Sequence, residues 1–222
     1  MAQVAPTTAR ETSDHWTERS GHFNAAASHI RHGDAWRDMF RAALGEAPLE
    51  IADLGTGTGA CALTLAEIGH RVTAVDGSEG MLSIARAGAE ERGLPVNFVH
   101  ATMDDAALPS EAFDVVTLRN VIWTLEVPEA AIRLAARLLR PRGTLLVSDG
   151  LWRTQKEEPD APEFYARLPF RNGLTEADAR ALLLAGGFTN LRSWGEAIPF
   201  NPYETMGEPD FFILTAEKPV SR

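Results

Sequence analysis

The stretch that decides the fold is Ile51-Ala52-Asp53-Leu54-Gly55-Thr56-Gly57-Thr58-Gly59-Ala60-Cys61-Ala62-Leu63. It begins like a buried strand and ends in an apolar segment typical of a helix, with three glycines at alternate positions between the two. Glycine lets the backbone turn tightly and lets a ligand approach where a Cβ would collide. The helix that follows presents unpaired N–H groups and a positive dipole end. The stretch therefore predicts a ligand-holding loop, because such glycines are costly in a turn that binds nothing.

Outward from this loop, short apolar runs alternate with amphipathic segments. The runs are Leu49–Leu54, Arg71–Val75, Val96–His100, Phe113–Leu118 and Thr144–Ser148, and the amphipathic segments are Ala60–Ile68, Glu79–Arg92 and Pro128–Leu139. Strands buried on both faces read as near-continuous apolar runs, as a parallel sheet covered by helices requires. The alternation predicts an α/β fold with a doubly wound, mostly parallel sheet.

The segments after the fifth run break this rhythm. Residues 151–173 contain three prolines and a charged patch, and we expect a surface excursion there. Thr175–Ala185 is predicted to be a helix, with a capping-box signal from Thr175 and Asp178 and an end at Gly186-Gly187. Phe188–Ile198 and Phe211–Glu217 predict two further strands, which makes seven. Pro141-Arg142-Gly143 predicts a turn before the fifth strand.

The N-terminal part reads differently from the rest of the chain. Residues 1–13 are expected to form a loose tail, and residues 14–44 two or three short helices interrupted at Gly21 and Gly33. We therefore divide the chain into a tail and helical lid, 1–44, and a ligand-binding domain, 45–222, with the excursion at about 151–173.

Composition and charge narrow the function classes. The 222 residues are 45% apolar and 23% charged, as in ordinary globular proteins, and the formal net charge is −10. An acidic balance without basic clusters disfavours nucleic acid and anionic membrane surfaces. The single cysteine, Cys61, fits a reducing compartment, Met1–Asp14 lacks the apolar core of a signal peptide, and no apolar stretch approaches about 20 residues. We expect a soluble cytoplasmic protein.

Two cofactors fit the glycine loop. Gly55-x-Gly57-x-x-Ala60 satisfies the dinucleotide fingerprint in relaxed form, with the acidic Asp76 about 20 residues further on. Read from Asp53 as Asp-x-Gly-x-Gly-x-Gly, the same loop resembles motif I of class I S-adenosylmethionine-dependent methyltransferases. A carboxylate two residues before the first glycine suits a cationic amino group and would repel a pyrophosphate. The chain after the fifth strand is also too short for a second nucleotide-binding half, so we favour S-adenosylmethionine.

The resemblance extends over about residues 49–218 and implies a Rossmann-like seven-stranded sheet under an N-terminal helical lid. Val72–Ser78 looks like the family's second strand, ending in an acid, Asp76, that accepts both ribose hydroxyls. Leu138–Val147 is similar to the segment before the family's fifth strand. At the adenine edge the family's first aspartate is replaced by Ala101. The resemblance assigns the following residues to the cofactor: Asp53, Gly55, Thr56, Gly57, Gly59, Asp76, Gly77, Ser78, Met81, Met103, Asp104, Arg119 and Asn120.

The acceptor site is expected between the lid and the excursion. Trp16–Phe23 resembles the opening helix of small-molecule members of the family, with Phe23 where a tyrosine is usual. Arg119 to Trp123 follow the fourth strand, and ligands in open α/β sheets bind at the carboxyl ends of the strands. The residues predicted to contact substrate are Trp16, Phe23, Trp123 and Tyr165. The catalytic residues stay unassigned, with Asn120, His29 and Tyr165 as candidates.

The resemblance implies methyl transfer to a small molecule. Transfer from a sulfonium is an in-line displacement that mainly needs orientation and exclusion of water, with a base only if the nucleophile must lose a proton. Whether N, O or C accepts the methyl group stays open, as does monomer or homodimer. His29 and His32 are three apart, but no second cluster completes a metal site, so we expect none.

Three other functions stay open. A lyase or cyclase would use the cofactor itself as substrate and release methylthioadenosine. A catalytically silent partner subunit would bind the cofactor without turnover. A nicotinamide-dependent oxidoreductase would use the dinucleotide form of the fingerprint.

Overall fold

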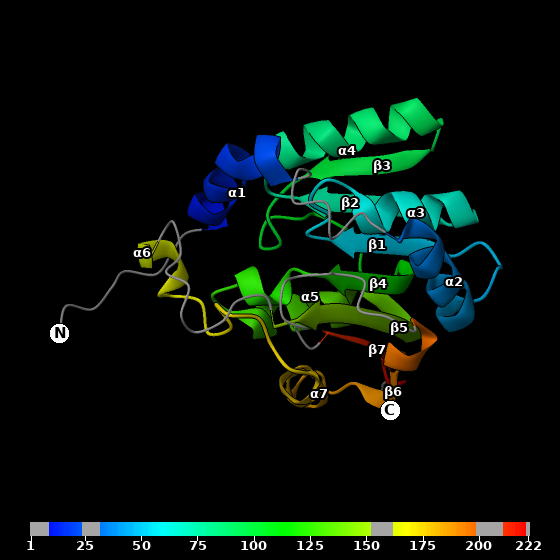
Figure 1. Ribbon diagram of the computed structural model, residues 1–222. Coiled ribbons are helices and arrows are strands. Elements are labelled where there is room, and N and C mark those ends of the chain that lie inside the picture. The colour runs from blue at the N-terminus through cyan, green and yellow to red at the C-terminus, as the bar shows by residue number, and fades with distance from the viewer. Residues whose placement is uncertain (1–8, 24–31, 152–161, 199–210, 221–222) are drawn as a thin grey trace.

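A seven-stranded sheet forms the centre of the computed structural model, which describes residues 9–23, 32–151, 162–198 and 211–220 (Figure 1). The strands lie in the order β3-β2-β1-β4-β5-β7-β6. All pairs among the first five strands are parallel, whereas β7 runs antiparallel to both of its neighbours. The strands are β1 Glu50–Leu54, β2 Arg71–Asp76, β3 Val96–His100, β4 Phe113–Arg119, β5 Leu139–Gly150, β6 Thr189–Ser193 and β7 Phe211–Glu217. The predicted fold class, a doubly wound and mostly parallel α/β sheet, is confirmed.

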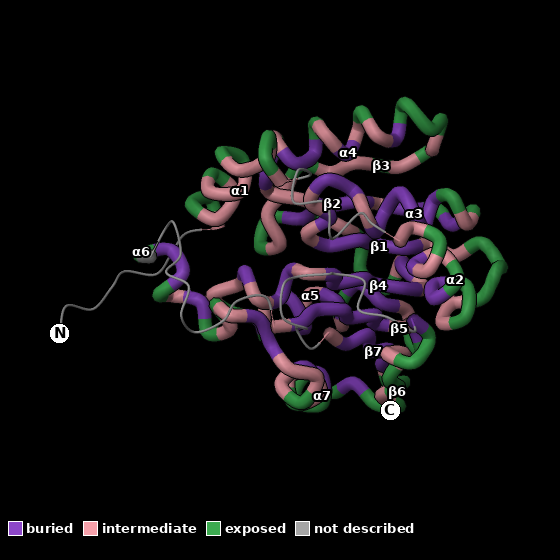
Figure 2. The backbone as a smooth tube through the Cα atoms, in the orientation of Figure 1, coloured by how far each residue is buried: buried purple, intermediate pink, exposed green. Residues whose placement is uncertain are grey.

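Helices cover both faces of this sheet (Figure 1). They are α1 Ala9–Phe23, α2 Gly33–Leu44, α3 Ala60–Ile68, α4 Glu79–Arg92, α5 Pro128–Leu138, α6 Pro162–Tyr165 and α7 Glu176–Ala185, with short 3₁₀ turns η2 Ile122–Thr124 and η3 Gly195–Ala197. Figure 2 shows that burial concentrates in the sheet and in the helix faces against it, whereas α1 is pink and green throughout. Of the described residues of α1, none is buried.

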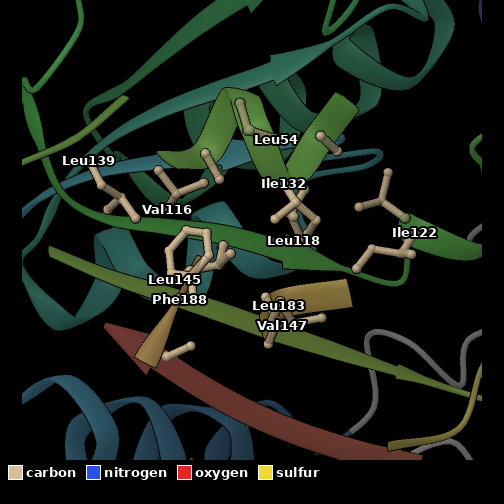
Figure 3. Close-up of a cluster of buried hydrophobic side chains, with 14 of the residues drawn as sticks. Leu54, Val116, Leu118, Ile122, Ile132, Leu139, Leu145, Val147, Leu183 and Phe188 are labelled. Atoms are coloured by element: carbon tan, nitrogen blue, oxygen red, sulfur yellow. The ribbon is translucent and has the colours of Figure 1, made fainter. Parts of the chain in front are cut away.

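Successive side chains of β1 and β4 point to opposite faces of the sheet, so they belong to two hydrophobic cores, one on each face. Ile51 and Val115 pack in a cluster with Trp36 and Phe40 of α2 and with α3. The residues next to them in sequence point to the opposite face of the sheet, which packs against α5 and α7. Figure 3 shows the cluster on that face, which includes Leu54, Val116, Leu118, Ile122, Ile132, Leu139, Leu145, Val147, Leu183 and Phe188. The same alternation places Asp53, Thr117 and Arg119 on the α2–α3 face, at the carboxyl ends of their strands.

Several expected elements have the predicted bounds. The helices at 60–68 and 79–92 and the strands at 96–100 and 211–217 coincide with α3, α4, β3 and β7. The capping box is present at the start of α7, where Thr175 accepts from the backbone N–H of Asp178 and the Asp178 side chain accepts from the backbone N–H of Thr175. Local signals were sufficient where a cap or a glycine ends the element.

Three expected elements differ from the structure, namely the N-terminal tail, the turn before the fifth strand and the sixth strand. The predicted loose tail is too long, because α1 already begins at Ala9, and α1 runs through Gly21. The predicted turn at 141–143 is a bulge inside β5, where residues 140–143 lie opposite the single residue Asp114 of β4. The predicted strand at 188–198 ends at Ser193, since the 3₁₀ turn η3 follows. Most of the predicted excursion, 152–161, lies outside the described residues.

Within the described part of the chain, no helix is both long and apolar enough to cross a bilayer.

Glu67 at the end of α3 joins three helices. Its carboxylate accepts hydrogen bonds from Arg37 of α2 at 2.8 Å and from Arg92 of α4 at 3.0 Å. Partial burial favours the neutral acid, but the two guanidinium hydrogen bonds outweigh it, and the net result is a pKa of Glu67 below its ordinary 4.5. The ion pairs therefore stabilise the fold whenever Glu67 is ionised.

We expect Glu67→Gln to lower the free energy of unfolding by about 1 kcal/mol, since two partly exposed ion pairs contribute about 0.5 kcal/mol each. The folded pKa is lowered, so this contribution is complete above pH 4.5 and is lost as the pH falls through the folded value. Urea unfolding at pH 7 and at pH 3.5 measures both effects. Exposed Glu91 of α4 is the matched control, and an equal loss in Glu91→Gln would contradict the assignment.

Candidate functional site

A cavity of about 480 Å³ opens at the carboxyl ends of the first four strands. It lies where the strand order reverses between β1 and β4, the usual ligand position in open α/β sheets. Its walls come from the loops after β1, β2, β3 and β4 and from α1. The described residues that line it are Ala9, Thr12, Ser13, Trp16, Phe23, Asp53, Gly55, Thr56, Gly57, Thr58, Ala60, Cys61, Val75, Asp76, Gly77, Met81, Ala101, Thr102, Met103, Asp104, Arg119, Asn120, Val121, Trp123, Thr124, Leu125, Glu126, Val127, Ala130 and Ala131.

The three glycines of the loop after β1 all have positive φ. Gly55 is closely packed, whereas Gly57 faces open space. A Cβ on Gly55 would lie 2.4 Å from Cγ2 of Val121, so this glycine permits close packing against the loop after β4. A Cβ on Gly57 would meet no atom within 4 Å, and Gly57 lines the cavity. Gly55 is therefore required by the fold, whereas the open space at Gly57 is suited to a ligand.

Asp53 is almost completely buried beneath this loop, with 1% of its surface exposed. Its carboxylate accepts hydrogen bonds from Thr117 Oγ1 at 2.5 Å and from Thr56 Oγ1 at 2.6 Å. Burial raises the pKa of Asp53, and the two hydroxyl hydrogen bonds oppose that shift. The Asp53 carboxylate thus lies at the cavity wall with both oxygens already oriented.

Asp76 ends β2 and joins two loops. One carboxylate oxygen accepts from the backbone N–H of Gly57 and the other from the backbone N–H of Ser78, both at 2.8 Å. Burial raises the pKa of Asp76, and these two hydrogen bonds oppose it. Each oxygen keeps a second lone pair, so the group can accept from two further donors. Ser78 serves as the N-cap of α4, because its hydroxyl accepts from the backbone N–H of Met81 at 3.1 Å.

The loop after β4 is held in an unusual backbone conformation at Asn120. This residue has φ 55°, a left-handed conformation that asparagine tolerates better than most residues. Its N–H donates to the carbonyl of Ser148 at 2.7 Å, and its own carbonyl accepts from Nε1 of Trp123 at 3.1 Å. The Trp123 indole is thereby fixed at the cavity wall.

An aromatic cluster forms the outer part of the site. The Trp16 ring meets the Trp123 and Phe23 rings edge-on, each with centroids 5.9 Å apart. Tyr165 stacks parallel to Trp123 with centroids 6.2 Å apart, and its hydroxyl lies 3.4 Å from Nε2 of His15. Edge-to-face and stacked pairs of this kind restrict ring orientation. The cavity therefore has a polar inner part at the glycine loop and an aromatic outer part.

The cavity brings together most of the predicted site residues. Of those assigned to cofactor or substrate, Gly59, Ser78 and Tyr165 do not line it, since Gly59 faces Ala85 and Leu63, Ser78 caps α4, and Tyr165 is 2% exposed behind Trp123. His29 lies outside the described residues, and His32 is the N-cap of α2. The other predicted residues that line it are Trp16, Phe23, Asp53, Gly55, Thr56, Gly57, Asp76, Gly77, Met81, Met103, Asp104, Arg119, Asn120 and Trp123.

Sequence reasoning missed Thr12, Ser13, Thr58 and Thr102, which also line the cavity. Thr58 lies within the glycine loop, so its position in the motif was a usable signal. Ser13 and Thr12 carried no signal, because they belong to a segment expected to be a tail. Only the docking of α1 brings them to the site.

The residues present fit S-adenosylmethionine. Thr58 is 6% exposed, and within the described structure its hydroxyl has no hydrogen-bond partner, as expected of a group that a ligand satisfies. The open space at Gly57 and the spare lone pairs of Asp76 suit an amino-acid group and a ribose. Among the described residues, no group of three or more His, Cys, Asp or Glu could hold a metal ion.

Comparison with known proteins finds a methyltransferase family and relatives named as methyltransferases. Residues 52–147 match the sequence model of a family described as a methyltransferase domain. A ubiquinone biosynthesis O-methyltransferase of Ruegeria pomeroyi is 34% identical over 46% of this chain and 41% of its own. A demethylmenaquinone methyltransferase of Thermus thermophilus is 42% identical over 47% and 49%. This chain thus covers less than half the length of these curated relatives. Among solved structures, the [4+2]-cyclase SpnF has a TM-score of 0.72 at 20% identity, over 98% of both chains, which shows a shared fold.

The wall supplied by α1 is docked through small residues. The helix α1 lies beside the start of α4 (Figure 1), where Thr17 Oγ1 and Ser78 Oγ are 2.8 Å apart. A Cβ on Gly80 would lie 2.7 Å from Ser20 Oγ and 3.1 Å from the carbonyl oxygen of Thr17. None of the described α1 residues is buried, so this polar contact and the aromatic contact of Trp16 with Trp123 hold the wall in place.

We expect Gly80→Ala to displace α1 and to weaken binding of S-adenosylhomocysteine several-fold, while leaving the melting temperature near or above that of the wild type. Alanine raises helix propensity by up to about 1 kcal/mol, so a loss of affinity would come from the contact with α1. Calorimetry gives the affinity, and hydrogen exchange reports the opening of α1. Gly88→Ala is the matched control, because its Cβ would meet only the flexible tip of Leu63. Unchanged exchange in α1 would contradict this role of Gly80.

Proposed function

We propose that this chain, whose residues 52–147 match a methyltransferase-domain family, is a class I S-adenosylmethionine-dependent methyltransferase that transfers a methyl group to a small, ring-bearing acceptor. The proposal rests on one observation: a single cavity joins the glycine loop and Asp76 to its aromatic outer part. Trp16, Phe23 and Trp123 line this outer part, which we call the aromatic compartment. The inner part suits the cofactor, and the outer part suits a flat acceptor.

S-adenosylmethionine, when bound, supplies an activated methyl group on a sulfonium. In our proposal Asp76 accepts hydrogen bonds from the ribose hydroxyls, while the backbone at Gly57 leaves space for the amino-acid end. Met81, Met103 and Asp104 border the adenine. These residues bind and orient, which is most of what an in-line displacement needs.

The aromatic compartment orients the acceptor and excludes water. Trp123 is held by the carbonyl of Asn120, and Trp16 meets it edge-on, so the two indoles form a rigid apolar wall. A closed apolar wall limits solvent at the reacting atoms. Asn120 lines the cavity three residues before Trp123, and we propose it as the group that orients the nucleophile. Tyr165 supports Trp123 from behind.

The chemistry of the acceptor follows from the compartment and the relatives. One curated relative is named for ubiquinone biosynthesis and the other for demethylmenaquinone, and quinones present a planar ring with oxygen substituents. Aromatic side chains pack well on planar rings. We therefore propose a ring hydroxyl as the acceptor, with ring carbon as the alternative.

The test is transfer of tritium from methyl-labelled S-adenosylmethionine to a panel of catechols, hydroquinones and phenols. We expect labelled product from an ortho-dihydroxylated or hydroquinone ring together with S-adenosylhomocysteine. Trp123→Ala should raise KM for the acceptor by tenfold or more, through loss of an aromatic contact and of the wall. Binding of the cofactor without labelling of any ring, amine or extract component would refute methyl transfer.

The lyase or cyclase alternative is decided in the same assay by a different product. A fold neighbour is named a [4+2]-cyclase, so the fold itself does not require methyl transfer. Methylthioadenosine in place of S-adenosylhomocysteine, formed without any acceptor, would favour this alternative.

For the cofactor site, we expect Asp76→Ala to weaken binding of S-adenosylhomocysteine by about 2–3 kcal/mol, because charge-assisted hydrogen bonds are lost. Isothermal calorimetry on ligand-stripped protein measures this. The control is Asp105→Ala, which removes an exposed carboxylate hydrogen-bonded to Thr102. Equal affinities of Asp76→Ala and wild type would mean that the ribose is held by other residues.

A further inference from the structure

The charges along the cavity are unevenly distributed. Four acidic side chains line it, those of Asp53, Asp76, Asp104 and Glu126, whereas Arg119 is the one basic side chain among the described lining residues. The amino-acid end of S-adenosylmethionine carries both an ammonium and a carboxylate. Acidic groups can bind the ammonium. Among the described residues that line the cavity, only Arg119 can neutralise the carboxylate by charge.

The strand register places Arg119 at the inner, polar part of the cavity. Arg119 is the last residue of β4, two positions beyond Thr117, so both side chains lie on the same face of the sheet. Thr117 donates its hydroxyl to Asp53, which pairs with it across β1 and β4. The Arg119 charge opposes the raised pKa of Asp53, so the two groups interact electrostatically. A cation and an anion thus lie together where a zwitterion would bind.

Trp36 of α2 holds the guanidinium of Arg119. The Cζ atom of Arg119 lies 4.1 Å from the centroid of the Trp36 ring, and Arg119 is only 8% exposed. Trp36 is 2% exposed in the first turn of α2 and is packed in the core with Phe40. A guanidinium carries its N–H donors around its edge, so a contact through its face does not consume them. A desolvated cation–π contact of this kind is among the stronger ones.

We propose that Arg119 binds the carboxylate of the methionine moiety of the cofactor, and that Trp36 is a positioning residue for Arg119. Trp36 itself is absent from the described cavity lining and acts through the guanidinium. A bidentate arginine–carboxylate pair is planar and directional, so its strength depends on how the guanidinium is held. This inference rests on the proposed use of S-adenosylmethionine and deepens it.

A simpler role for Arg119 would be to neutralise buried Asp53 without touching the ligand. The two roles differ in one measurable respect. A residue that binds the carboxylate distinguishes S-adenosylmethionine from its decarboxylated form, which keeps the sulfonium and the ammonium. A residue that only stabilises Asp53 affects both ligands alike.

The experiment is isothermal calorimetry of the full chain with S-adenosylmethionine, decarboxylated S-adenosylmethionine and methylthioadenosine. The variants are Arg119→Gln, Arg119→Lys, Trp36→Leu and Trp36→Phe. Met39→Ala, a truncation in the same helix and the same core cluster, is the control for loss of packing. Melting temperatures show which variants remain folded.

We expect Arg119→Gln to weaken S-adenosylmethionine binding by about tenfold or more, with changes of less than about twofold for the two ligands that lack the carboxylate. Trp36→Leu should weaken S-adenosylmethionine binding by about three- to tenfold with the same selectivity, because the cation–π contact is lost. Trp36→Phe should restore most of the affinity, Arg119→Lys should restore little of it, and Met39→Ala should weaken no ligand selectively. If Arg119→Gln fails to fold, the comparison of Trp36→Leu with Trp36→Phe still decides the matter.

Parallel losses for S-adenosylmethionine and its decarboxylated form would overturn the proposal, as would wild-type S-adenosylmethionine affinity in Trp36→Leu. This failure is distinct from failure of the proposed function. Methyl transfer without discrimination of the carboxylate would refute only the role of Arg119 and Trp36. Selective binding without transfer to any acceptor would refute only the methyl transfer.

Discussion

The Asp76 carboxylate is the interaction on which the arrangement of the site depends. It accepts the backbone N–H of Gly57 from the loop after β1 and that of Ser78 at the start of α4, and so joins the ends of two adjacent parallel strands. The same strand end receives the N–H groups of Gly55 and Thr56 on the carbonyl of Val75. The three contacts made by Gly55, Thr56 and Gly57 give the glycine loop one shape, and the positive φ at its glycines makes that shape accessible.

Everything else in the site is attached to that loop. Gly55 lets Val121 approach, which places the loop after β4 against it, and the left-handed conformation at Asn120 then directs its carbonyl to Trp123. The start of α4 receives α1 through Ser78 and Gly80, which completes the aromatic compartment. The cavity therefore combines a rigid polar part, built on strand ends, with an outer wall whose helix contributes no buried residue among those described. Such a division suits a site that must hold one ligand tightly and admit another.

The charged side chains of Asp53, Asp76 and Arg119 lie in the polar part of the cavity, at the strand ends. Buried Asp53, Thr117 and Arg119 lie on one face of β1 and β4, and Trp36 covers the guanidinium from α2. A buried arginine is costly unless its charge is compensated. In the proposed complex the ligand carboxylate would provide part of that compensation. The packing of α2, which carries Trp36, would then contribute to recognition of the cofactor.

Local patterns determined much of this protein in advance. The strand–loop–helix unit at 51–63, the acid at 76, the capping box of α7 and the sheet class follow from side-chain period, glycine and capping chemistry, which act over a few residues. The start of α1 at Ala9, the bulge at 140–143 and the removal of Tyr165 from the cavity lining did not follow, and neither did the contact of Arg119 with Trp36. Each depends on partners distant in sequence: α1 on the start of α4, the bulge on Asp114, Tyr165 on Trp123, and Arg119 on α2. Only tertiary structure decided them, because packing between remote segments outweighs local preference where the local signal is weak.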